Sequence, residues 1–182
     1  MSRPPAQRTE IVPYDPRWPG LAEGAIGELR GALGGVVGEI EHIGSTAVPG
    51  LAAKPVIDLM GAAEELEAVE RRGAVLAGLG YVPLDPGMPE RLLFVRQADG
   101  RRTHHFHVVT AASWPHRAQR LFRDHLRAHP EDATRYALLK RRIAEAGSDP
   151  DAYTEAKTEL VQELTDRARA ERGLPPASVW EG

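Results

Sequence analysis

An isolated acidic residue inside an aliphatic stretch is the feature of this sequence that most constrains its fold. Asp58 lies within residues 56–60, whose sequence Val-Ile-Asp-Leu-Met predicts a buried strand. An ionised carboxylate among aliphatic side chains is costly unless a partner or a ligand requires it there. An earlier apolar strand, expected over residues 36–43, ends at Gly44 and Ser45. Such a turn offers backbone N–H groups and a hydroxyl to a phosphate, so we expect a binding site between the two strands.

The spacing of apolar residues predicts the remaining elements. Helices are expected near residues 20–33, 64–79, 114–128, 131–146 and 151–172, and further strands over 81–84, 91–97 and 103–110. Pro83 marks the strand at 81–84 as an edge strand, because proline cannot donate to a sheet ladder. This order predicts an α+β fold, in which a small mixed β-sheet is packed with helices and followed by a helical C-terminal part. We expect one domain over residues 10–172, a disordered N-terminus at 1–9 and a tail at 173–182.

Composition excludes several classes of protein. The chain has 182 residues, 42% hydrophobic and 27% charged, which is typical of a globular domain. Its net charge of −3 gives no basic surface for nucleic acid, and no specific nucleic-acid partner is indicated. With no cysteine, disulfides and thiolate sites are excluded. Because the first ten residues lack the apolar run of a signal peptide and no later run is long enough to span a bilayer, we expect a cytoplasmic protein with no membrane partner.

The first group of candidate site residues surrounds the Gly-Ser turn. Ser45 offers a hydroxyl to a phosphate oxygen, Lys54 offers a point charge, and Asp58 is a candidate ligand for Mg²⁺. The alternative is purely structural: Gly44 would be a turn glycine, Ser45 would cap a short helix, and Lys54 and Asp58 would form an internal ion pair.

The second group is a pair of histidines on the second arm of a hairpin, which is expected from residues 91–97 and 103–110. Alternation along this arm places Phe106 on one face and His105 and His107 on the other. His105 and His107 are two residues apart, so they face the same side of a strand, roughly 6.5–7 Å from each other at a rise of about 3.3 Å per residue. Two such imidazoles can share a metal or flank an anionic substrate, and Asp58 becomes the third ligand if the hairpin pairs next to its strand. Alternatively, both rings face solvent without a function.

Weaker candidates lie elsewhere in the chain. Glu41 and His42 point to opposite faces of their strand, so at most one of them can reach Asp58. Most basic residues of the last three helices are expected on solvated faces. Two of the chain's three lysines, Lys140 and Lys157, each follow a tyrosine by four residues, and either could contact the base or the phosphate of a nucleotide.

Three segments of the chain resemble the GrpB family: residues 42–51 (His-Ile-Gly-Ser-Thr-Ala-Val-Pro-Gly-Leu), 53–59 (Ala-Lys-Pro-Val-Ile-Asp-Leu) and 104–109 (His-His-Phe-His-Val-Val). The resemblance spans about residues 10–170 and implies a nucleotidyltransferase-like fold; a similar domain is fused to dephospho-CoA kinase in some bacteria. It also implies that Gly44 and Ser45 hold a triphosphate and that Asp58 matches the second of two metal-binding carboxylates. Val56 stands where the resemblance implies the first of the two carboxylates. The nucleotidyltransferase pattern usually has a third carboxylate on a later strand, and here the strand expected over residues 103–110 has imidazoles instead.

These observations predict a nucleotidyltransferase-like protein that binds a nucleotide or another phosphorylated small molecule. The predicted reaction is metal-dependent nucleotidyl or phosphoryl transfer, with Mg²⁺, Mn²⁺ or Zn²⁺ as the candidate ion. The residues assigned to catalysis and metal binding are Asp58, His105 and His107, and those assigned to the phosphates are Gly44, Ser45 and Lys54. Because Val56 cannot ligate a metal, two alternatives stay open: a non-catalytic, degenerate ligand-binding module and a metal-dependent hydrolase that uses histidine and aspartate.

Overall fold

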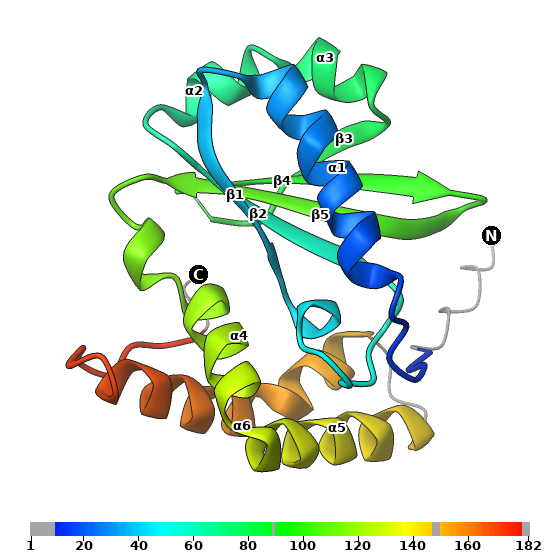
Figure 1. The fold of residues 1–182 in the computed structure, drawn as a ribbon, viewed down its shortest axis with the longest axis vertical. Helices are drawn as coiled ribbons and strands as arrows, with labels where there is room; N and C mark the ends of the chain where they lie inside the picture. The colour runs from blue at the N-terminus through cyan, green and yellow to red at the C-terminus, as the bar shows by residue number, and fades with distance from the viewer. Residues whose placement is uncertain (1–9, 89, 147–149, 180–182) are drawn as a thin grey trace.

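A five-stranded mixed sheet forms the centre of the protein in the computed structural model (Figure 1). The structure describes residues 10–88, 90–146 and 150–179, except the side chains of 150–154. The strands are β1 (Val37–Ile43), β2 (Ile57–Ala63), β3 (Tyr81–Leu84), β4 (Arg91–Ala98) and β5 (Arg101–Thr110), in the spatial order β1-β2-β5-β4-β3. β2 and β5 run parallel and the other neighbours are antiparallel. The α+β fold and the edge position of β3 are therefore confirmed.

Helices lie beside the sheet and beyond one end of it. They are α1 (Trp18–Leu33), α2 (Leu66–Glu70), α3 (Gly73–Gly78), α4 (Ala118–Ala128), α5 (Pro130–Glu145) and α6 (Pro150–Ala170), with single 3₁₀ turns at η1 (Ser45–Ala47) and η2 (Trp114–His116). Figure 1 shows α1 crossing the sheet, while α4, α5 and α6 gather near η1 as the predicted helical C-terminal part. None of the described helices is both long enough and apolar enough to cross a membrane.

The alternation predicted for the second hairpin arm is confirmed and divides the core between the two faces of the sheet. Phe106 and Val108 pack with Leu29 and Leu33 of α1 in the larger core cluster. Val109 points to the opposite face, where a smaller cluster lies. The odd-numbered residues of β5, which include His105 and His107, therefore face the same side as this smaller cluster.

Two predicted helices differ from expectation. The helix expected over residues 64–79 is two short helices with a turn at Arg71 and Arg72, and the second begins at Gly73, a residue that is unfavourable inside a helix. The helix expected near 114–128 begins only at Ala118, because Pro115 lies in the separate turn η2.

The C-terminal segment returns along α6. The Gln162 side chain donates to the carbonyl oxygen of Ala177 at 2.8 Å and accepts from the backbone N–H of Val179 at 3.0 Å. The described part of the predicted tail therefore docks on the helix. Trp180, the expected disorder of residues 1–9 and the turn expected at 147–149 lie outside the described residues.

Candidate functional site

The predicted site residues share one cavity of about 370 Å³. It lies where the end of β1, the start of β2 and the middle of β5 meet η1 and the last three helices. All six residues predicted for the site line it: Gly44, Ser45, Lys54, Asp58, His105 and His107. The remaining polar lining comes from Thr46, Gln119, Tyr136, Lys140, Lys157 and Thr158.

The turn after β1 packs closely against Asp58 of β2. The antiparallel register places Ile43 opposite Asp58, so that Gly44 continues past its side chain. Gly44 has a φ of 74°, and a β-carbon built on it would lie 2.6 Å from Oδ2 of Asp58. Only glycine accommodates both this backbone conformation and this contact.

A histidine–aspartate pair forms across the parallel strands. Asp58 is the register partner of His105, and Nδ1 of the imidazole lies 2.9 Å from Oδ1 of the carboxylate. A carboxylate only accepts, so Nδ1 carries the proton and the lone pair of the neutral ring is on Nε2. Nε2 is buried and has no hydrogen-bond partner within the described part of the chain. The pair thus presents an oriented base without a protein partner.

His107 has a different environment although it lies on the same strand face. The guanidinium Nε of Arg91 donates to Nδ1 of His107 at 3.1 Å, which places the proton of the neutral ring on Nε2. Burial, with the nearby charge of Arg91, holds the pKa of His107 well below its usual value. One ligand atom each from Asp58, His105 and His107 lie within 4.8 Å of one another, so the predicted trio does come together.

All three lysines of the chain converge on this cavity. Lys140 of α5 donates from Nζ to Oγ of Ser45 at 3.0 Å and to the carbonyl oxygen of Ala52 at 2.6 Å. Burial, aided by the charges of Lys157 and Lys54, lowers the pKa of Lys140 to about 7. Burial and Lys54 lower the pKa of Lys157 to about 8, against an opposing effect of Asp58. Burial also lowers the pKa of Lys54. Mutual repulsion among the three ammonium groups favours the uptake of an anion.

Glu41 and His42 do not line the cavity. The Glu41 carboxylate accepts from Arg120 at 2.8 Å and from Arg123 at 2.7 Å, which ties β1 to α4. His42 lies 2.8 Å from the hydroxyl of Thr46, and burial lowers its pKa to about 4. Both residues therefore hold the elements around the site.

The comparisons with known proteins agree with this picture of the fold. The GrpB protein family matches residues 8–167. The chain belongs to the GrpB family. A UPF0157 protein of Pseudomonas aeruginosa is 41% identical over 90% of this chain and 69% of its own length, and YqkA of Bacillus subtilis is 32% identical over 91% and 48%. A dephospho-CoA kinase of Mycolicibacterium paratuberculosis is 30% identical over 87% of this chain and 45% of its own length.

Solved structures extend the comparison. The crystal structure of the conserved protein GrpB from Enterococcus faecalis covers 90% of this chain and 99% of its own, with a TM-score of 0.83 and 30% identity. The poly(U) polymerase Cid1, solved with Mg and 3′-dATP bound, covers 81% of this chain and 50% of its own, with a TM-score of 0.54 and 12% identity. At that identity the likeness shows a nucleotidyltransferase-like fold alone.

The donor set of this GrpB cavity does not fit a pair of Mg²⁺ ions. Two-metal sites hold their ions mainly through carboxylates. Asp58 is the one carboxylate among the described residues that line the cavity. Val56, at the position where the nucleotidyltransferase pattern has another carboxylate, also lines the cavity but has no ligand atom.

Sequence reasoning missed part of the site. Arg91, Gln119, Phe122, Thr158 and Val161 were not predicted, although the last four line the cavity. They carry no local motif and meet only through long-range packing. Lys140 and Lys157 had a weak signal in their spacing from tyrosines, and Nζ of Lys140 does lie 4.6 Å from the ring centroid of Tyr136.

Proposed function

We propose that the cavity binds a nucleotide or another phosphorylated small molecule. The observation that carries this proposal is the convergence of Lys54, Lys140 and Lys157 on a cavity that also contains a glycine–serine turn. Phosphate oxygens would accept from the ammonium groups and from the turn, and their negative charge would relieve the repulsion among the lysines. In this arrangement the lysines supply the positive charge that metal ions supply in two-metal enzymes.

The apolar part of the lining suits the other half of a nucleotide. Ile43, Val56 and Val161 line the cavity, and the rings of Phe122 and Tyr136 pack edge to face with centroids 5.2 Å apart. Concave sites that combine apolar walls with a few convergent polar groups bury the flat rings of small ligands. A nucleobase or a similar ring would lie against this wall, with the amide of Gln119 available to hydrogen-bond its edge.

We further propose that His105 acts as the general base in a phosphoryl or nucleotidyl transfer. Asp58 fixes the imidazole with Nδ1 protonated, and Nε2 accepts a proton from the hydroxyl of an acceptor or from water. The acceptor oxygen forms a bond to phosphorus while the bond from phosphorus to the leaving phosphate oxygen breaks. The lysines stabilise the charge that develops on that leaving oxygen.

A metal-dependent hydrolase is the second candidate function. The ligand atoms of Asp58, His105 and His107 lie close enough together for one divalent ion, which favours this candidate. Arg91 opposes it, because its donation to Nδ1 leaves His107 with a protonated Nε2. Metal analysis of protein purified without chelator separates the two functions: a bound ion that is lost in His107→Ala would support the hydrolase.

Binding and turnover of chosen probes test the proposal. Calorimetric titration with ATP, UTP and dephospho-CoA, the last suggested by the kinase relative, should show binding of at least one. In Lys54→Gln we expect affinity at least about tenfold weaker, since a charged hydrogen bond contributes about 1.5–3 kcal/mol. The matched control is Asp85→Asn, on an exposed loop. If none of the probes binds, or if Lys54→Gln binds as wild type does, the proposed ligand class is wrong.

Turnover distinguishes the enzyme from the non-catalytic module that Val56 suggests. Asp58→Asn should keep much of the binding and lose turnover, because the amide no longer supports the imidazolium that forms at His105. Binding without product from any probe would favour the module. Equal turnover in wild type and Asp58→Asn would remove Asp58 from the mechanism.

A further inference from the structure

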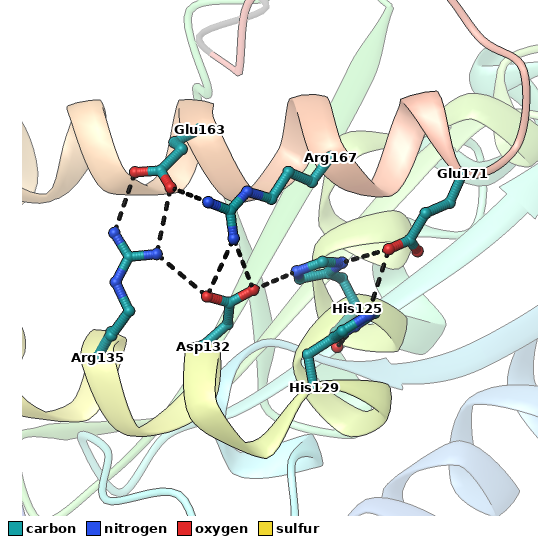
Figure 2. Close-up of polar contacts among 7 residues, drawn as sticks. All are labelled: His125, His129, Asp132, Arg135, Glu163, Arg167 and Glu171. Carbon is teal, nitrogen blue, oxygen red and sulfur yellow. Dashed lines mark hydrogen bonds and ion pairs between the residues drawn. The ribbon is translucent and has the colours of Figure 1, made fainter.

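A second group of side chains of the types that ligate metals lies outside the cavity, at the junction of α4, α5 and α6 (Figure 2). It consists of His125 on α4, His129 at the start of α5, and Glu171 just after α6. One ligand atom from each lies within 4.8 Å of the others. The two imidazoles stack, with centroids 4.1 Å apart and planes 20° from parallel.

The outer hydrogen bonds place one lone pair of each histidine on the ring nitrogen that lies near the glutamate. Nε2 of His125 lies 2.8 Å from Oδ2 of Asp132, so its proton points to that carboxylate and Nδ1 carries the lone pair. Nδ1 of His129 donates to the carbonyl oxygen of His125 at 3.0 Å, which leaves its own lone pair on Nε2. Such contacts from an imidazole to a carboxylate or a carbonyl are the usual support of metal-bound histidines.

One of these lone pairs has no partner. His125 has a side chain only 1% exposed, and its Nδ1 makes no hydrogen bond within the described part of the chain. It lies 3.6 Å from Oε1 of Glu171, while Nε2 of His129 lies 3.3 Å from the same oxygen. A proton on Nε2 of His129 would give this nitrogen a hydrogen bond to Glu171. The contact between Nδ1 of His125 and Glu171 would still have no donor. A cation between the three atoms satisfies all of them.

The distances suit a tetrahedral ion. Ligand atoms about 2.1 Å from a tetrahedral zinc ion lie roughly 3.4 Å apart, close to the two separations that involve Glu171. Asp132 is itself held by Arg135 at 3.1 Å and by Arg167 at 3.4 Å, so the orientation of His125 is fixed (Figure 2). The side chains of His129 and Glu171 are 32% and 46% exposed, which leaves a route for an ion and space for a water as fourth ligand.

We propose that Nδ1 of His125, Nε2 of His129 and the carboxylate of Glu171 form a binding site for a divalent transition metal of the Zn²⁺ class. A donor set of two imidazoles and one carboxylate favours Zn²⁺ over Mg²⁺ or Ca²⁺. The ion would tie the end of α6 to the junction of α4 and α5. Because α6 also carries Lys157 and Thr158, the same tie would hold one wall of the cavity.

Titration of the full chain with Zn²⁺ after chelator treatment tests the site. Wild type should bind one equivalent that is lost in both His129→Ala and Glu171→Gln, two partly exposed positions whose replacement should leave the fold intact. His116→Ala, at an exposed histidine outside the group, and His105→Ala, in the cavity, should both retain it. Asp132→Asn should weaken binding about 10–100-fold through the orientation of His125.

Two further readouts keep the test decisive. Co²⁺ in place of Zn²⁺ should give the intense visible absorption of a tetrahedral site in wild type and not in Glu171→Gln. Zn²⁺ should raise the melting temperature of wild type but not of His129→Ala. The proposal is overturned if wild type takes up no Zn²⁺, if both variants bind it as wild type does, or if the equivalent disappears in His105→Ala alone.

Discussion

Gly44 and Asp58 approach each other so closely that a β-carbon on the glycine would lie 2.6 Å from Oδ2 of the carboxylate. Gly50, in the same loop, has an almost identical φ of 78° but no atom within 4 Å of such a carbon. Both glycines therefore have a positive φ that a residue with a side chain rarely adopts, and Gly44 has in addition the contact with Asp58.

This difference predicts unequal effects of the same substitution. Gly50→Ala should lower the free energy of unfolding by about 1–2 kcal/mol, the usual cost of this backbone region for a residue with a side chain. Gly44→Ala should lower it further and also displace the turn of Gly44 and Ser45 from its place beside Asp58, so that the binding of an ATP probe to this turn weakens. Urea unfolding and calorimetry of both variants provide the measurement. Equal stability and equal binding in the two variants would show that the contact with Asp58 has no role.

The affinity of the cavity for phosphates should fall as the pH rises from 7 to 9. The pKa of Lys140 is about 7 and that of Lys157 about 8, so both ammonium groups lose protons over this range in the free protein. The phosphates of ATP are already largely ionised there, since the last pKa of a terminal phosphate group lies near 6. The loss of positive charge therefore weakens binding.

Calorimetric titration of ATP at several pH values checks this dependence. Lys157→Arg is the matched variant, because a guanidinium stays charged throughout the range and should flatten the slope. Affinity that is constant or rises with pH in wild type would contradict the assignment of the lysines to the phosphates.

Much of the sheet was predictable because a strand pattern is local. The period of two in residues 103–110 correctly separated Phe106 from His105 and His107, and the aliphatic context of Asp58 indicated a site. The parallel register of β2 and β5 brings Asp58 and His105 together, which is the pairing that the predicted site required.

The parts of the site that the sequence did not predict depend on contacts between distant segments. Lys140 and Ser45 are 95 residues apart and meet only when α5 packs against the loop that follows β1. The sequence around Lys157 does not show which way α6 faces, and Arg91 reaches His107 only through the register of the hairpin. In the same way, the spacing of His125 and His129 fits one helix face, but nothing local joins them to Glu171.

Chemical labelling of lysine side chains should report on the cavity alone. Every lysine of the chain lines it, so acetylation of lysine side chains measures access to one site. Because their pKa values are lowered, Lys140 and Lys157 carry more of the reactive neutral amine at pH 8 than ordinary lysines do. ATP should slow the labelling of all three lysines, as measured by peptide mass spectrometry. Added Nα-acetyl-lysine, whose side-chain amine is free, provides the reference labelling rate. Labelling rates that ATP does not change would place the ligand elsewhere.

Replacement of Lys140 should change how stability depends on pH. Its pKa is about 7 in the folded protein and 10.5 in the unfolded chain, so between these values the unfolded state binds more protons. The contribution of Lys140 to the free energy of unfolding therefore rises with pH, by at most about 1.4 kcal/mol per pH unit, and is least favourable below pH 7. Lys140→Met keeps an unbranched side chain without the charge.

The slope of stability against pH, measured by urea unfolding between pH 7 and 10, should therefore be shallower in Lys140→Met than in wild type. The variant also loses the donor to Ser45 and to the carbonyl of Ala52, a cost that depends little on pH and therefore leaves the difference in slope intact. The same variant should bind ATP less tightly than wild type at pH 6.5, where Lys140 is mostly charged. Identical slopes in the two proteins would mean that Lys140 keeps an ordinary pKa, and the charge assigned to this part of the cavity would have to be revised.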